Sequence, residues 1–199
     1  MRRRVALGLL AVVPVAALTR PARAQAPTQP PAQTPKPPDK KAALDQVLAA
    51  LKAAPDEEAA AMLEAHARAA WSEAGGPAVR LLLGRGQREL GESAPSEAFD
   101  SFDAALDLEP ELPEAWRGRA LARFRLGDTP GAVRDIQETL RREPRHFVAL
   151  QDLARIAETR EDWQGAYAAW QKVLELSPKT PNGAIRERDL RRRALGEDT

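Results

Sequence analysis

The sequence of 199 residues contains no cysteine, which excludes disulfide bonds, zinc clusters held by cysteine and thiol chemistry. Aromatic residues make up only 5% of the chain, β-branched residues are scarce, and no stretch alternates apolar and polar residues as a half-buried strand does. Alanine, leucine, arginine and glutamate are abundant, and all of them are strong helix formers. The composition therefore predicts an all-α protein.

The N-terminus has the layout of a secretory signal peptide. Three arginines precede an apolar run over residues 5–18, and small residues surround the expected cleavage point after Ala24. The run of 14 residues is shorter than the ~20 needed to span a bilayer, which favours cleavage over an uncleaved anchor. We therefore expect a signal peptide over residues 1–24 and a periplasmic location for the mature protein. The general secretory and twin-arginine routes both stay open.

The charge and composition that follow the signal peptide narrow the choice of partners. The full chain has a formal charge of +1, but without the five arginines of residues 1–24 it has 25 basic and 29 acidic residues. A net acidic chain argues against a nucleic-acid partner. Residues 25–41 hold six prolines and no large apolar residue, which predicts a disordered linker.

Two helices are expected over residues 42–76. Leu44, Val47, Leu48 and Leu51 have the spacing of one face of an amphipathic helix. A second helix follows Pro55 and ends at two consecutive glycines, residues 75 and 76. These residues predict a helical hairpin.

From residue 77 onwards the sequence is periodic, with a period of 34 residues. Several independent sets of residues share this spacing: Pro110, Pro144 and Pro178; Ala98, Ala132 and Ala166; Phe102, Ile136 and Trp170. A fixed period of this length is typical of a solenoid built from helix pairs.

The pattern resembles the tetratricopeptide repeat (TPR) family. Residues 113–146 carry it best, with Trp116, Ala120, Gly127, Ala132, Ile136 and Pro144, and residues 147–180 form a second copy. Residues 77–112 fit as a further repeat if two residues are inserted at the turn, which makes Gly91 its turn glycine. The resemblance implies a TPR-type solenoid of three antiparallel helix pairs. The hairpin at 42–76 would be a divergent N-terminal cap, and residues 181–199 a C-terminal capping helix and tail.

Close packing of the helices explains why small and bulky residues recur in fixed places. The residues expected to pack the repeats are Leu83, Gly84, Ala98, Phe102, Ala105, Trp116, Ala120, Ala132, Ile136, Leu150, Ala154, Ala166 and Trp170.

No set of residues predicts catalysis. Ser93 and Ser96 have no histidine near them in sequence, and the two-residue spacing of Glu64 and His66 places them on different faces of a helix. His146 is expected to be a polar surface residue in a turn between repeats. We expect no enzyme activity, no cofactor and no metal site.

The resemblance also implies where a partner would bind, because the first helix of each TPR lines a concave groove. The residues expected there are Arg85, Arg88, Arg117, Leu121, Phe124, Gln151 and Arg155. The arginines would suit an acidic peptide, although a solvated arginine surface explains them as well, and Phe124 would otherwise pack between repeats. The lysine and asparagine set of chaperone-binding TPR domains is not matched, so no heat-shock partner is implied. The expected function is a periplasmic adaptor that binds a peptide or protein. The alternative is a structural subunit of an envelope complex that uses its convex face or its ends and is held at the inner membrane if its signal stays uncleaved.

Overall fold

The computed structural model describes residues 40–196. The predicted signal peptide, residues 25–39 of the predicted linker and residues 197–199 lie outside this range. The linker was expected to reach residue 41, but the first helix already begins at Lys40. The Lys40 ammonium group donates a hydrogen bond of 3.3 Å to the backbone oxygen of Glu73, and lysine favours helix, so the helix starts earlier than expected.

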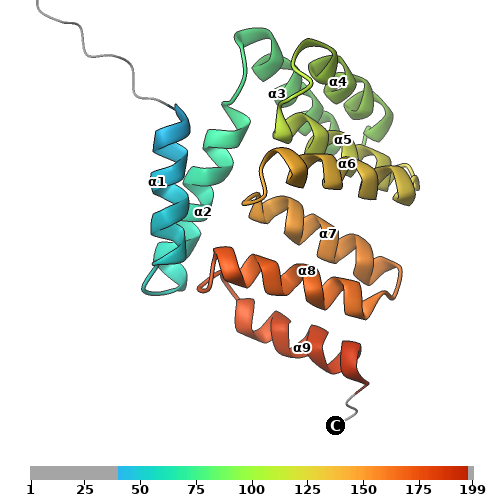
Figure 1. Ribbon diagram of the computed structural model, residues 1–199. Coiled ribbons are helices and arrows are strands. Elements are labelled where there is room, and N and C mark those ends of the chain that lie inside the picture. Colours follow the sequence, from blue (N-terminus) through green and yellow to red (C-terminus); the bar gives the residue numbers. More distant parts are fainter. Residues whose placement is uncertain (1–39, 197–199) are drawn as a thin grey trace, which may run out of the picture. The chain divides into compact units, whose positions relative to one another are not determined.

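Every secondary-structure element in the described range is an α-helix, which confirms the all-α fold. In chain order the helices are α1 (Lys40–Lys52), α2 (Glu57–Ser72), α3 (Pro77–Gly91), α4 (Pro95–Leu108), α5 (Pro113–Arg125), α6 (Thr129–Arg142), α7 (Phe147–Thr159), α8 (Trp163–Leu176) and α9 (Gly183–Leu195). The pairs α3–α4, α5–α6 and α7–α8 follow one another as a stack (Figure 1). Helix α9 packs on α8 through the buried Leu190, so it covers the last pair.

The helices begin where the sequence offers an N-terminal signal. Helices α3, α4 and α5 start at Pro77, Pro95 and Pro113, where the missing N–H of proline costs nothing. The N-cap of α6 is Asp128, whose carboxylate accepts a 2.9 Å hydrogen bond from the backbone N–H of Gly131 in the first turn.

The backbone marks the repeat register. Ser93, Gly127 and Glu161 have positive φ angles of 61°, 85° and 58°, and they stand 34 residues apart in the turn between the helices of each pair. Ser93, and not Gly91, therefore occupies the turn position of the first pair. The insertion predicted at this turn is wrong, because all three turns share one register. Helix α3 has 15 residues where α5 and α7 have 13, so its two extra residues precede Val79.

Phe102 of α4 shows why this register matters for packing. A Cβ atom placed on Gly86 would lie 2.8 Å from the Phe102 ring, and one on Gly118 would lie 2.2 Å from it. The ring therefore sits between the first helix of its own pair and the first helix of the next. Gly84, which the sequence suggested for this role, packs against no other helix among residues 40–196, because its Cβ would meet only Arg88, at 3.6 Å.

The other predicted packing residues are buried, except Trp116. Those with little or no exposed surface are Leu83, Ala98, Phe102, Ala105, Ala120, Ala132, Ile136, Leu150, Ala154, Ala166 and Trp170. Trp116 is partly buried between the guanidinium groups of Arg119 and Arg142, at 4.6 and 4.7 Å from its ring centroid. Its indole N–H donates a 2.7 Å hydrogen bond to the backbone oxygen of Pro110.

Helices α1 and α2 do not continue the stack. They lie beside the ends of the stacked helices (Figure 1), and their core includes Phe147 at the start of α7 and Leu176 at the end of α8. Glu64 of α2, with 2% of its surface exposed, accepts a 2.9 Å hydrogen bond from Ser177 in the turn after α8. The prediction that the hairpin caps the first repeat is therefore wrong. Its apolar stripe, with Trp71, is buried against helix ends, and the described core that contains it includes no residue of α3.

Candidate functional site

Residues 34 apart occupy equivalent places on successive helices, and we call each such set a column. Arg117 and Gln151 share one column on α5 and α7, and Leu121 and Arg155 share another. These two columns, with Phe124 on α5, form the surface that we call the groove. By their columns, five of the seven residues predicted for the groove share this side of α5 and α7, and Arg117 and Arg155 bond to the same carboxylate, that of Asp152. That these residues bind a ligand stays a prediction.

The other two predicted residues, Arg85 and Arg88 of α3, belong to different columns, those of Arg119 and Ala122. Arg119 bonds to carboxylates on α4 and α6, and Ala122 is fully buried, so these columns face neighbouring helices. The assignment depended on the insertion at the first turn, and the true register moves both arginines out of the groove.

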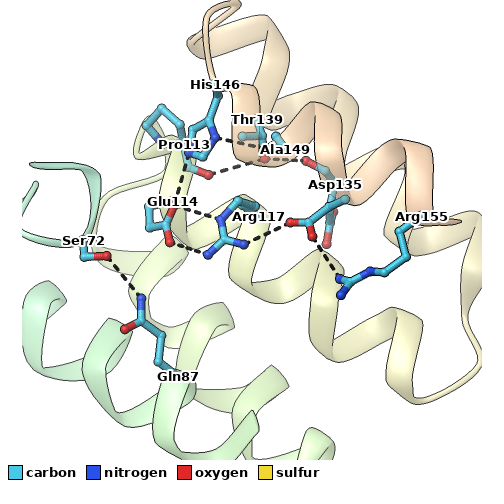
Figure 2. A network of polar contacts seen from close by, with 11 residues as sticks. Ser72, Gln87, Pro113, Glu114, Arg117, Asp135, Thr139, His146, Ala149 and Arg155 are labelled. Carbon is cyan, nitrogen blue, oxygen red and sulfur yellow. Dashed lines mark hydrogen bonds and ion pairs between the residues drawn. The ribbon is translucent and has the colours of Figure 1, made fainter. Parts of the chain in front are cut away.

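Arg117 lies in a buried network of charged residues at the edge of the groove (Figure 2). Its guanidinium group donates to both carboxylate oxygens of Glu114, at 3.0 and 2.6 Å, and to Asp152 of α7 at 3.0 Å. Asp152 also accepts a 2.9 Å hydrogen bond from Arg155, whose side chain is 53% exposed. The three-residue spacing of Glu114 and Arg117 could have been read from the sequence, whereas the role of Asp152 depends on how α5 and α7 pack.

His146 extends this network to α2. The sequence suggested a surface residue, but His146 is fully buried because its ring stacks on Trp71 with centroids 3.9 Å apart and planes 12° apart. Its Nδ1 accepts a hydrogen bond from the backbone N–H of Ala149, so the proton is on Nε2, which donates to Glu114 at 3.2 Å. The His146 side chain thus caps α7, donates a hydrogen bond to Glu114 and stacks on Trp71 of the hairpin.

The network shifts the acid–base properties of its members. Burial raises the pKa of the Glu114 carboxyl, but the charge of Arg117 and the hydrogen bond from His146 outweigh burial and lower that pKa to about 2. Burial lowers the pKa of Arg117, but Glu114 and Asp152 raise it above its ordinary value. Both groups therefore stay charged at neutral pH.

The charges of the groove balance. Arg117 and Arg155 meet Glu114 and Asp152, which gives two positive and two negative charges. The groove arginines are thus already neutralised by carboxylates of the same chain. The pairing removes most of the attraction that free arginines would exert on an acidic ligand.

Leu121 and Phe124 supply the apolar part of the groove, and both are partly buried. Leu121 packs against the core of the first pair, and Phe124 packs against the core shared by the second and third pairs. Packing between the repeats thus holds the Phe124 ring in place, while part of the ring stays exposed to solvent.

Helix α2 forms a wall along one side of the groove. Its residues Arg68, Trp71 and Ser72 line a cleft of about 130 Å³ together with Glu114, Arg117, His146 and Val148. Ser72 accepts a 3.4 Å hydrogen bond from Gln87, which lies in the column of Leu121 and Arg155 (Figure 2). The hairpin therefore narrows the surface that a ligand could reach.

Between residues 40 and 196, no three histidine, aspartate or glutamate side chains are grouped so that they could hold a metal ion. Within these residues, none of the helices combines the length and the apolar character needed to cross a membrane.

Comparison with known proteins bears on the family of the chain. No protein-family model matches the chain. A TPR repeat-containing protein of Rhizobium etli is 31% identical over 135 residues, which cover 68% of this chain and 66% of that relative, just under two thirds of its length. The chain belongs to the tetratricopeptide repeat family.

Solved TPR domains share its fold. The first TPR of Spaghetti, bound to an HSP90 peptide, has a TM-score of 0.56 and 21% identity, and the match covers 62% of this chain and 97% of that domain. The TPR domain of Sgt2 from Aspergillus fumigatus has a TM-score of 0.56 and 23% identity, over 62% of this chain and 83% of that one. The TPR2B domain of yeast Sti1, in a complex with pHsp70, has a TM-score of 0.54 and 17% identity, over 62% of this chain and all of that one.

Proposed function

We propose that this TPR protein is a non-catalytic adaptor that binds a peptide or protein segment in the groove between α5, α7 and the wall formed by α2. The observation that carries the proposal is the pair of columns on adjacent helices, Arg117 with Gln151 and Leu121 with Arg155. Solved domains of the same fold hold peptides of HSP90 and Hsp70, which supports a binding role. The identity of those peptides is not carried over.

The balanced charges of the groove favour a ligand of low net charge. Arg155 is half exposed but paired, and Gln151 can both donate and accept hydrogen bonds. Leu121 and Phe124 offer apolar contact beside them. Recognition by hydrogen bonds and apolar packing therefore fits this surface better than attraction of an acidic peptide.

The proposed place of action is the periplasm, reached through cleavage after Ala24. The support is the pattern of residues 1–24 in the sequence. N-terminal sequencing of the mature protein tests this part. A mature chain that starts at Met1 would contradict cleavage and would favour a protein held at the inner membrane.

Two variants test the groove, one that changes two of its residues and one that changes an exposed arginine elsewhere. The double variant Gln151→Ala/Arg155→Ala changes the groove, while Arg134→Ala changes an exposed arginine on α6. Arg117 is avoided because its loss would leave buried carboxylates unpaired. Partners recovered from envelope extracts by the parent protein should be lost with the double variant and kept with Arg134→Ala. The reverse result would support the structural-subunit alternative, in which the convex face is used.

A further inference from the structure

Three columns mark the side of each first helix that packs against the preceding pair. On α5 they contain Ala115, Gly118 and Ala122, and on α7 they contain Ala149, Asp152 and Ile156, all of which are buried. The same columns on α3 contain Leu81, Gly84 and Arg88. Within residues 40–196 no preceding pair covers them, and Leu81 is 75% exposed. We call this stripe the open face.

The open face of α3 has a glycine at the same place as the side of α5 that packs against α4 inside the stack. Between α4 and α5, Phe102 lies against Gly118, and Asp103 pairs with the neighbouring Arg119 at 2.5 Å. The residues one period earlier are Gly84 and Arg85, so α3 repeats the glycine followed by the arginine. At Gly118 the glycine is required, because a Cβ there would collide with the Phe102 ring.

Among the residues that the structure describes, none requires a glycine at position 84. A glycine in the interior of a helix destabilises it by roughly 0.5–1 kcal/mol relative to alanine. A Cβ on Gly84 would meet only the guanidinium of Arg88, at 3.6 Å, which is ordinary contact with a flexible side chain. Helix α3 thus has a glycine that lowers its stability at the place where a bulky side chain of another protein would fit.

A second exposed leucine lies at the same end of the stack. Leu108, at the end of α4, is 58% exposed, whereas Arg142, one period later, stacks on Trp116 and has a side chain only 8% exposed. Glu109, next to Leu108, accepts a 2.7 Å hydrogen bond from the backbone N–H of Gly76, just before α3. The open face therefore has apolar residues at the start of α3 and the end of α4.

We propose that the open face binds an amphipathic helix of another protein, with an aromatic side chain over Gly84 and a following carboxylate beside Arg85. Arg85 already pairs with Glu89 of its own helix through Nε, at 2.7 Å, so the incoming carboxylate would share this arginine, as Asp103 and Asp135 share Arg119. Arg88 acts on Glu89 only at longer range and forms no salt bridge within residues 40–196, so it would meet a further acidic residue of that helix. This surface is separate from the groove and does not depend on it.

A second copy of the chain fits this face poorly. Its exposed large apolar residues within the described range are leucines, an isoleucine and a methionine, and none is aromatic. Two open faces placed together would also bring Arg85 and Arg88 of each copy against those of the other.

The probe that tests the open face is a peptide with the sequence of residues 95–108, because this helix carries Phe102 followed by Asp103. A lactam between Asp100 and the lysine introduced by Ser96→Lys, both on the exposed face of this helix, holds the peptide helical, since short isolated helices are marginal in water. Labelled peptide is titrated with the full chain and followed by fluorescence anisotropy. We expect saturable binding that weakens at least tenfold with Gly84→Leu in the protein, and equally with Phe102→Ala in the peptide.

Gly91→Leu is the matched control, since a side chain at this glycine of the same helix would meet open space. It should leave the affinity of the peptide unchanged. Absence of saturable binding up to about 1 mM, or equal weakening by both glycine variants, would overturn the proposal. Sedimentation of the full chain provides another test. Self-association that disappears with Leu81→Glu would assign the face to a second copy and would also overturn it.

Thermal melting of the protein alone tests the premise about Gly84. Gly84→Ala should raise the Tm, because it adds helix propensity and meets no obstacle, while Gly118→Ala should lower the Tm through collision with Phe102. A fall in Tm with Gly84→Ala would show that this glycine is needed inside the chain, and the proposal would then fail.

Discussion

At the scale of single residues, Glu114 links the stability of the protein to pH. Its pKa is lowered to about 2 from an ordinary 4.5, so the folded protein binds this proton more weakly than the unfolded chain does. The stabilisation is therefore complete above about pH 4.5 and is lost as the pH falls towards 2, with a size on the order of 3 kcal/mol. Urea unfolding of the parent and of Glu114→Gln between pH 6 and pH 3 measures it.

The variant should be less stable than the parent at pH 6, and the difference should shrink towards pH 3. At pH 3 the carboxyl of the unfolded parent is largely protonated while the folded one, with a pKa of about 2, is still mostly charged, so most of the stabilisation is lost through the unfolded chain. Glu138→Gln is the control, since that carboxylate also pairs with arginines but lies at the surface. A constant difference between parent and Glu114→Gln across this range would contradict the assignment of the charge to Glu114.

A second residue-scale prediction concerns the turn positions. Glu161 has a φ of 58°, in the left-handed region that costs a non-glycine residue about 1–2 kcal/mol. Glycine removes this cost but adds freedom to the unfolded chain, so Glu161→Gly should stabilise the protein by about 0.5–1 kcal/mol. Gly127→Ala, at the equivalent turn, should destabilise it. Chemical denaturation of both variants checks the pair, and destabilisation by Glu161→Gly would argue against the turn register.

At the scale of elements, the period of 34 residues was enough to predict the helix pairs, since each pair repeats the same small and bulky positions. It did not fix the register of α3, because Gly84 and Gly86 are both glycines and either could be the small residue of the first pair. Only contact with Phe102 distinguishes them. The same ambiguity affects the predicted groove. If Gly84 is taken as the small residue of α3, Arg85 and Arg88 fall in the groove.

The hairpin shows a different limit of sequence reasoning. Its amphipathic pattern predicts two helices with a buried face but does not say which surface they cover. That choice depends on contacts between residues far apart in the chain, such as the stacking of Trp71 on His146 and the hydrogen bond between Glu64 and Ser177. Neither histidine nor serine at these positions has a sequence signature that predicts burial.

At the scale of the whole molecule, the hairpin should open separately from the repeats. Trp71 is its main contact with the stack, because its ring packs on both His146 and Phe147. Trp71→Ala should therefore cost the docked state about 3–5 kcal/mol. The core of the α5–α6 and α7–α8 pairs contains no hairpin residue, so the stack should stay folded when the hairpin is released.

Hydrogen exchange of the Trp71→Ala protein tests this separation. The amides of α1 and α2 should lose protection while those of α5 to α8 keep most of theirs, because their hydrogen bonds and packing are made within the repeats. Met62→Ala, on the same helix but 61% exposed, should leave both groups unchanged. A uniform loss of protection from α1 to α8 would mean that hairpin and repeats unfold as one unit. The wall of the groove would then be a fixed part of the stack, and the groove could not widen by release of α2.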